Sequence, residues 1–169
     1  MANQVFEFDP VTHITAGAIG VPGQRVFYIQ AERGLDRVTL LCEKEQVQAL
    51  AEAIDEMTGK LEEEFNLARL PAPSVDEAKM TIKEPVEPLF RIGAMALGYD
   101  ANRDRMLLVA QEELAEDVER DPEEVRFFAT REQMQNLSVY AKGVVGRGRS
   151  TEQRVLQAEA YVRRNGHGE

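Results

Sequence analysis

The side chains that most often carry chemistry near neutral pH are scarce in this chain, which holds two histidines and one cysteine. His13 follows an Asp-Pro turn, and His167 lies close to the C-terminus. A histidine that acts as a general base needs a partner within hydrogen-bond reach, and neither sequence neighbourhood supplies one. We therefore expect both histidines to be surface residues rather than catalytic ones.

Cys42 stands at the junction between a predicted strand and a predicted helix. A helix N-terminus can lower the pKa of a thiol and make it reactive. An internal repeat, described below, places Ala129 at the equivalent position, which indicates that a small buried residue is needed there. We therefore predict a core cysteine, since unpaired cysteines usually pack as small apolar residues.

Two short motifs resemble ion-binding loops but depart from them where the geometry is most demanding. Residues 100–104 (Asp-Ala-Asn-Arg-Asp) match the start of a calcium loop, yet Arg105 stands where glycine is needed and Gln111 where glutamate is needed. A hairpin turn is the better interpretation. Residues 143–149 resemble a phosphate-binding loop but follow a helix, so we predict a helix end and a flexible linker there.

No nucleophile motif, dinucleotide-binding fingerprint or metal-ligand cluster is found in the sequence. The single cysteine also excludes an internal disulfide framework and a multi-cysteine zinc site. We therefore expect neither a cofactor nor a metal ion, and the sequence favours a protein that is not an enzyme.

The chain is acidic, with a formal net charge of −10, and this charge is unevenly distributed. Residues 142–169 hold six basic and three acidic side chains, so the rest of the chain carries −13. A surplus of acids repels phosphates, which argues against nucleic acid and anionic membranes as partners. We expect the basic tail to dock on the acidic body. An RNA-binding tail is the alternative, and only Tyr161 would offer it a stacking platform.

Segments that would direct the chain out of the cytoplasm are not evident. Residues 1–7 have no basic start and no long apolar stretch, unlike a signal peptide. No apolar run is long enough to cross a bilayer, and a single cysteine fits a reducing compartment. We therefore expect a cytoplasmic protein.

Any functional site must be positioned by strands and helices, and the spacing of apolar residues indicates where these elements lie along the chain. Runs rich in β-branched and aromatic residues predict strands over residues 5–8, 14–20, 26–31 and 38–42. Apolar residues then recur every three or four positions, so residues 44–65 are predicted to form an amphipathic helix. Residues 67–88 hold four prolines and little periodicity, which indicates a linker.

The second part of the chain repeats this order. Strands are predicted over residues 89–99, 105–112 and 125–129. The acidic stretch 112–124 suits a mobile surface loop. Thr130 followed by Gln133 is a capping-box pattern that begins a helix, and the same pattern begins a short C-terminal helix at Ser150.

The two parts also match each other in sequence. Residues 38–50 align without a gap with residues 125–137, at a constant offset of 87 residues. Upstream, residues 25–30 resemble residues 105–110, and residues 16–18 resemble residues 92–94. A unit of this length used twice indicates a duplicated domain rather than a solenoid. We predict a pseudo-twofold domain in which a cleft between the halves is the first place to look for a ligand.

These features predict an α+β fold in which internally duplicated strand–strand–strand–helix units form a mostly antiparallel sheet with helices packed on one face. Residues 1–148 would form a single duplicated domain, with halves at about 4–66 and 89–148 joined by the linker 67–88. Residues 149–169 would form a C-terminal helical tail.

Four polar residues stand in otherwise apolar strands and are the candidate ligand-binding residues: Arg25, Gln30, Arg91 and Gln111. The alternative is simple outward alternation along half-buried strands. Our leading hypothesis is a non-catalytic binding or adaptor protein that engages a protein partner or a small anionic ligand. The rival hypothesis is a small enzyme that acts on a phosphorylated or anionic metabolite and clamps the anion with Arg25 and Arg91. The sequence does not define an oligomeric state.

Several stretches carry a family resemblance: residues 4–10 (QVFEFDP), 20–25 (GVPGQR), 27–31 (FYIQA) and 84–93 (EPVEPLFRIG). They resemble an uncharacterised bacterial family, catalogued as domain of unknown function 3090 and typical of Actinobacteria and Chloroflexota. The resemblance covers residues 4–148 and implies a bacterial cytoplasmic protein, without an assigned activity.

The C-terminus departs from that family. Many relatives end in a cysteine-rich, zinc-ribbon-like tail followed by Arg-x-Asn-Gly. Here residues 149–162 hold no cysteine and are predicted to be helical, although residues 163–166 (RRNG) keep the final motif. If zinc belongs to the role of the family, this member acts without metal or in a narrower way. Relatives are often encoded near phosphatase-like and kinase-like proteins, which implies a link to phosphate metabolism or signalling.

Overall fold

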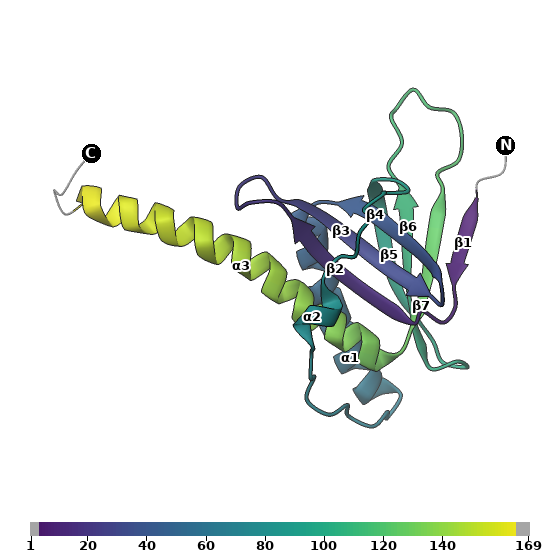
Figure 1. Cartoon of the computed structure of the whole chain (residues 1–169). Coiled ribbons are helices and arrows are strands. Elements are labelled where there is room, and N and C mark those ends of the chain that lie inside the picture. The colour runs from purple at the N-terminus through teal and green to yellow at the C-terminus, as the bar shows by residue number, and fades with distance from the viewer. Residues whose placement is uncertain (1–3, 165–169) are drawn as a thin grey trace.

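The fold is known from a computed structural model that describes residues 4–164, with side chains described for residues 4–147 (Figure 1). The first half contributes β1 (Val5–Phe8), β2 (His13–Ile19), β3 (Val26–Arg33), β4 (Asp36–Cys42) and α1 (Lys44–Glu64). A short helix, α2 (Glu77–Met80), lies in the segment that connects the halves. The second half contributes β5 (Ile92–Asp100), β6 (Arg105–Glu112), β7 (Glu124–Ala129) and α3 (Arg131–Arg164). Every predicted strand is present, with differences at the strand ends; the strand predicted over residues 89–99 begins only at Ile92, because residues 89–91 pair with β4 instead.

The described strands form two sheets. Sheet A has four strands in the order β1-β7-β6-β5, and sheet B has three in the order β2-β3-β4. Neighbouring strands are antiparallel except for β1 and β7, which are parallel. The predicted α+β class and mostly antiparallel pairing are confirmed, with the strands divided between two sheets rather than joined in one.

The segment that begins each half pairs with the sheet of the other half. β1 of the first half pairs with β7, the last strand of the second half, so that Phe8 lies opposite Phe127. Residues 89–91, which begin the second half, pair with β4 of the first half through a parallel bridge between Leu41 and Arg91. Each half therefore extends the sheet of the other half, which ties the two together through backbone hydrogen bonds.

The strand pairing defines which residues of the two halves are equivalent. Phe27 lies opposite Cys42, and Met106 lies opposite Ala129. Because Cys42 and Ala129 are related by the 87-residue offset, Phe27 corresponds to Met106. The upstream sequence match paired Phe27 with Leu107 and was wrong by one residue. A shift of one residue turns every inward side chain of a strand to the opposite face, so the correction decides which side chains meet in the core.

Both long helices begin with the same cap, and each cap also binds the other half. The side-chain oxygen of Gln46 accepts from the Glu43 backbone N–H at 2.8 Å, and that of Gln133 accepts from the Thr130 N–H at 2.9 Å. The capping box predicted at Thr130 is therefore confirmed. The two glutamine amide nitrogens donate, at 3.1 Å each, to the carbonyls of Ile92 and Val11. The caps thus anchor each helix to the half that does not contain it.

α3 runs without interruption to Arg164, so the helix end predicted at residues 143–149 was wrong, as was the separate helix from Ser150. A glycine costs about 1 kcal/mol in a helix interior. Val144 and Val145, which stand between two glycines, are only 3% and 4% exposed, and their burial offsets that cost. His167 and the end of the predicted tail lie outside the described residues.

Inward faces of both sheets pack with α1 and α3 into one hydrophobic core, whose largest buried side chains include Ile29, Leu40, Ile54, Phe127 and Leu137. Cys42 is 3% exposed within this core, and its burial raises the pKa of the thiol to about 12. The predicted core cysteine is therefore confirmed. In the part of the chain that the structure describes, no helix is both long and apolar enough to span a bilayer.

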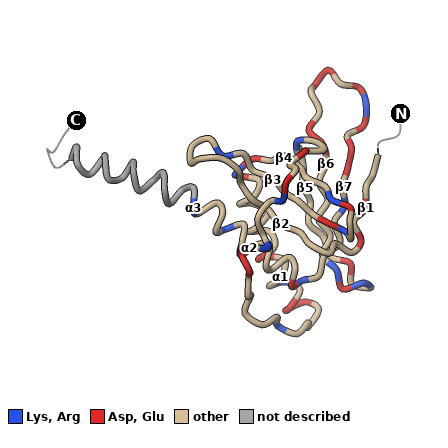
Figure 2. Tube along the Cα trace, viewed as in Figure 1, with Lys and Arg blue, Asp and Glu red and all other residues tan. Residues whose placement is uncertain are grey.

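Acidic residues are prominent along the loop between β6 and β7 (Figure 2). Two of the cations that follow residue 141 pair with acids of the body: Lys142 with Asp55, and Arg147 with Glu77 at 3.2 Å. These two contacts agree with a basic segment docked on an acidic body. The side chains beyond residue 147 lie outside the described residues.

Candidate functional site

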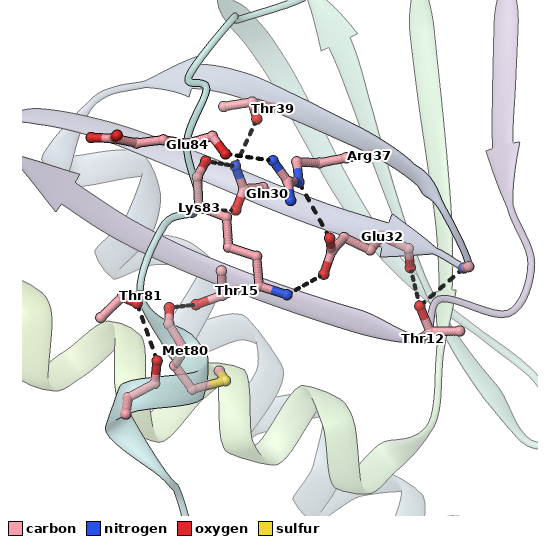
Figure 3. Close-up of polar contacts among 12 residues, drawn as sticks. Thr12, Thr15, Gln30, Glu32, Arg37, Thr39, Met80, Thr81, Lys83 and Glu84 are labelled. Atoms are coloured by element: carbon pink, nitrogen blue, oxygen red, sulfur yellow. Dashed lines mark hydrogen bonds and ion pairs between the residues drawn. The ribbon is translucent and has the colours of Figure 1, made fainter.

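The segment that connects the halves crosses the outer face of sheet B, where polar side chains hold it (Figure 3). The Thr15 hydroxyl donates to the Met80 carbonyl at 2.6 Å. Gln30, only 1% exposed, accepts from the Lys83 backbone N–H at 2.8 Å and donates to the Lys83 carbonyl at 3.0 Å. Its amide nitrogen also donates to the Thr39 hydroxyl at 3.0 Å. Gln30 therefore binds the segment as the backbone of a neighbouring strand would.

Two cations share one carboxylate beside this segment. Glu32 accepts from Lys83 Nζ at 2.7 Å and from Arg37 Nε at 3.2 Å, and Figure 3 shows it between them. The hydrogen bond from Lys83 is the largest cause that lowers the pKa of Glu32, with Arg37 adding to the effect. Arg37 also donates to the carbonyl of Glu84 at 3.1 Å. The three side chains of Glu32, Lys83 and Arg37 together carry one positive charge.

A cleft of about 520 Å³ lies where the segment leaves sheet B. Its lining includes Phe6, Phe8, Arg37, Val38, Pro85 and Pro88, and we call it the inter-half cleft. The two phenylalanines belong to β1 in sheet A, whereas Arg37 and Val38 belong to β4 in sheet B. The lining therefore comes from both sheets and from the end of the connecting segment.

The lining of the inter-half cleft favours a particular kind of ligand. Phenylalanine and proline side chains provide apolar walls, and the Phe8 ring is fixed by a tilted contact with Phe127 at 5.9 Å between ring centroids. Arg37 contributes a cation suited to a carboxylate or phosphate. Glu87 also lines the cleft, and its charge opposes a polyanion. An apolar body with a single anionic group fits these residues best.

The two arginines of the expected anion clamp have separate partners. Arg25 donates to the Val144 carbonyl at 3.1 Å and lies over the Phe27 ring, 4.9 Å from its centroid. Arg91 donates to Glu43 at 2.6 Å. Arg25 therefore connects β3 to α3, whereas Arg91 lies beside the start of α1. No contact joins the two within residues 4–147.

The two glutamines among the candidate residues also have protein partners. Gln30 binds the connecting segment, as described above. Gln111 donates to Glu124 at 2.9 Å, and this hydrogen bond is the largest cause that lowers the pKa of Glu124, followed by the hydrogen bond from Arg126. The structure brings no two of the four candidate residues into contact, and the described lining of the inter-half cleft includes none of them.

The sequence analysis did not identify Arg37 as a candidate ligand-binding residue. It stands at the start of a strand, next to the turn at Gly34, where charged residues are ordinary. The alternation of Val38 and Leu40 toward the core does place Arg37 on the opposite face, together with Glu32 of the neighbouring strand. This shared outer face was the sequence signal that could have identified Arg37.

His13 lies opposite Glu32 at the start of β2 and is partly buried, in contrast to the predicted surface position. Its Nε2 atom is buried and has no hydrogen-bond partner among the described residues. Burial is the largest cause that lowers the pKa of His13, and the nearby charge of Lys83 lowers it further. Within residues 4–147, no group of three or more histidine, cysteine or acidic side chains is placed to hold a metal ion.

These features define a class of protein: a pseudosymmetric α+β domain whose halves exchange their first segments and leave a cleft between two sheets. The chain belongs to the family described as protein of unknown function (DUF3090), which matches residues 6–155. The family resemblance of the sequence is thereby confirmed. Neither the comparison with curated proteins nor that with solved structures found a match.

Proposed function

We propose that the protein is a non-catalytic binding protein that holds a small anionic ligand in the inter-half cleft. The observation that supports this function is the cleft itself, about 520 Å³ in volume and lined by both sheets. Such a volume lies in the range of small-molecule sites, which combine apolar walls with a few polar groups. Arg37 is the polar group that would bind the anion.

Arg37 is well placed for this role because its environment already fixes its guanidinium. Contacts with Glu32 and the Glu84 carbonyl restrict the side chain, so less conformational entropy is lost when a ligand binds. Lys83 shares the charge of Glu32, which leaves positive charge beside the cleft. The apolar part of the ligand would contact Phe6 and Phe8.

The rival function, an enzyme that acts on an anionic metabolite, would need the anion clamp at a site where chemistry could occur. Arg25 and Arg91 instead bind the Val144 carbonyl and the Glu43 carboxylate. The inter-half cleft, in contrast, offers one cation and apolar walls. The binding function is therefore the one that the geometry supports better.

Native mass spectrometry of the protein, purified gently from its own host, tests this function directly. A reproducible additional mass that corresponds to an acidic small molecule supports the proposal and identifies the ligand. A bare chain, or a chain that carries only a second polypeptide, contradicts the proposal.

Anilinonaphthalene sulfonate is a suitable fluorescent probe because it combines an aromatic body with one anionic group. We expect Arg37→Gln to weaken its binding by roughly tenfold, the effect of losing one charge-assisted hydrogen bond. Arg33→Gln is the matched control, since Arg33 is an exposed arginine of the neighbouring strand. If the two variants bound the probe with equal affinity, the probe would bind outside the inter-half cleft, which would contradict the proposed site.

A further inference from the structure

β5 is an unprotected edge of sheet A. It is nine residues long, contains no proline and has no charged residue before Asp100. β1, at the other edge, has four residues and includes Glu7. Long, uncharged edge strands present free backbone groups that can pair with another strand. Gly93, Ala94 and Ala96 of β5 are exposed, so this edge is accessible.

The equivalent edge strand in the first half, β2, is contacted by α3 and by α2 of the connecting segment. β2 occupies the position in sheet B that β5 occupies in sheet A, and α2 packs beside it. The Thr15 hydroxyl of β2 donates to the Met80 carbonyl at the end of α2, at 2.6 Å. Within the described residues, no segment plays this part for β5, because the connecting segment exists only once.

A groove of about 380 Å³ separates α1 from β5. We define this α1–β5 groove by Gln46, Ala49, Leu50 and Ala53 of α1 and by Met95 and Leu97 of β5. A smaller hollow shares Ala53 and Leu97 and continues along α1 to Met57 and Lys60. The groove is therefore elongated and runs beside an edge strand, which is the arrangement in which extended peptides add to a sheet.

Comparison of the halves explains why space is present here. Ala53 of α1 corresponds to Tyr140 of α3 at the 87-residue offset, and Tyr140 is buried at 7% exposure. Ala49 corresponds to the larger Asn136. On the strand, Met95 is only partly buried, whereas its equivalent by strand pairing, Ile14, is 2% exposed. Small side chains on α1 thus leave open a space that the other half fills.

The charge of the groove indicates which partner it would accept. Glu45 is exposed, lines the groove and makes no ion pair or hydrogen bond through its side chain within the described residues. All the other described lining residues of the groove are uncharged, so Glu45 carries the sole charge of this lining. An unpaired carboxylate at the margin of an apolar groove, on a chain of net charge −10, is complementary to a basic side chain.

We propose that the α1–β5 groove binds an extended segment of a partner protein as an additional strand of sheet A, next to β5. Alternate apolar side chains of that segment contact Leu50 and Leu97, and a lysine or arginine pairs with Glu45. This site is separate from the inter-half cleft and makes the protein an adaptor that can carry a ligand and a partner together.

A display library of random linear peptides, selected on the full-length protein, tests the proposal. Ala53→Tyr fills the groove with the side chain that the equivalent position of α3 already carries, so the variant is expected to fold. Enriched peptides should alternate apolar residues, carry a basic residue, and lose about tenfold or more of their affinity on Ala53→Tyr. Val139→Tyr, at an exposed position of α3, is the matched control and should bind them normally.

Two further measurements separate strand addition from other binding. Hydrogen exchange of the β5 amides should slow when an enriched peptide binds, and Glu45→Lys should select against basic peptides without changing the fold. Arg37→Gln should bind the peptides normally, so failure of the inter-half cleft leaves this test unaffected.

Three outcomes would overturn the proposal. The first is the absence of peptides enriched over the Ala53→Tyr protein, and the second is protection of amides outside β5. The third is a dimer of the wild-type chain that Ala53→Tyr dissociates, because it would assign the groove to a second copy.

Discussion

Asp55 of α1 and Lys142 of α3 form an ion pair although they occupy equivalent positions in the two halves. Ala51 and Ser138, which are also 87 residues apart, meet one helical turn away, where the Ser138 hydroxyl donates to the Ala51 carbonyl at 3.1 Å. Equivalent residues can touch each other only at the axis that relates the halves. The pseudo-twofold axis therefore passes between α1 and α3, and opposite charges stand where identical side chains would face each other.

The first prediction tests this contact. Lys142→Asp would place two carboxylates at the axis, and we expect it to lower the free energy of unfolding by about 1 kcal/mol, since both side chains are half exposed. Adding Asp55→Lys restores the opposite charges in reversed order and should recover part of that loss. Urea unfolding of the wild type, both single variants and the double variant measures the coupling.

A coupling energy near zero in that cycle would contradict the role of the pair. Lys60→Asp serves as the control, because Lys60 pairs with Glu56 within α1 and more of both side chains is exposed. Lys60→Asp should lower the free energy of unfolding by less than Lys142→Asp does.

The second prediction concerns Gly17, which lies beneath the connecting segment. A Cβ atom at this position would stand 2.7 Å from Cγ1 of Ile82, closer than packed atoms allow. We expect Gly17→Ala to lower the free energy of unfolding by about 1 kcal/mol or more. Ile82→Ala should remove most of that cost, so the two substitutions should be non-additive in urea unfolding.

Gly98 provides a matched control for this prediction. Strand pairing makes it the equivalent of Gly17, and a Cβ atom there would meet nothing within 4 Å. Gly98→Ala should therefore be neutral or slightly stabilising, because alanine restricts the unfolded chain. An equal loss in both variants would argue that strand flexibility, rather than the contact with Ile82, sets the cost.

Local sequence patterns were sufficient to predict the repeated unit. The gap-free match of residues 38–50 with residues 125–137 depends on a strand, a cap and a helix that are contiguous in the chain. Such signals need no knowledge of tertiary structure. The register of β3 against β6 was not recoverable in this way, because β3 and β4 are joined by residues 34–35 alone, whereas β6 and β7 are joined by the long loop of residues 113–123.

Contacts between distant segments were beyond these patterns. The exchanged segments are short, and the sequence of residues 89–91 does not indicate that they pair with β4. Gln30 was interpreted as a polar residue available to a ligand, whereas its amide binds Lys83, 53 residues away. A buried amide satisfied by a distant backbone has the same sequence signature as one that faces a ligand. A cleft between the halves was expected, whereas the described lining of the inter-half cleft comes from β1, β4 and the connecting segment, with Leu89 alone from the second half. Arg37 was identified only once the segment that ends at Pro88 was placed beside it.

The third prediction is a pH dependence of stability that originates at His13. Burial and Lys83 hold its folded pKa below the ordinary value of 6.5, while Glu32 opposes them. The unfolded chain therefore binds a proton at a higher pH than the folded chain does. The contribution of His13 to stability is complete above pH 6.5 and is lost as the pH falls toward the folded pKa.

Urea unfolding at several pH values checks this prediction. Between neutral pH and about pH 5, the wild type should lose more stability than His13→Gln, since acidic side chains titrate mainly below that window. Their difference isolates His13 from the remaining titratable groups. If the free energy of unfolding changed equally with pH in the two proteins, the imidazole of His13 would have the same pKa in the folded and the unfolded chain, and the prediction would be wrong.

The fourth prediction concerns the reactivity of Cys42. Its thiol is 3% exposed, and its pKa is raised to about 12, first by burial and then by the charge of Glu43. The thiolate is the reactive species, so the folded protein should not react with Ellman's reagent at neutral pH, whereas the protein unfolded in urea should react completely. Cys42→Ala should remove the reaction and cost about 1 kcal/mol of stability. The cost should be small because Ala129 fills the equivalent core position at 0% exposure.

Rapid labelling of Cys42 in the folded chain would contradict this prediction. It would show that β4 opens at its junction with α1, where the exchanged residues 89–91 are bound.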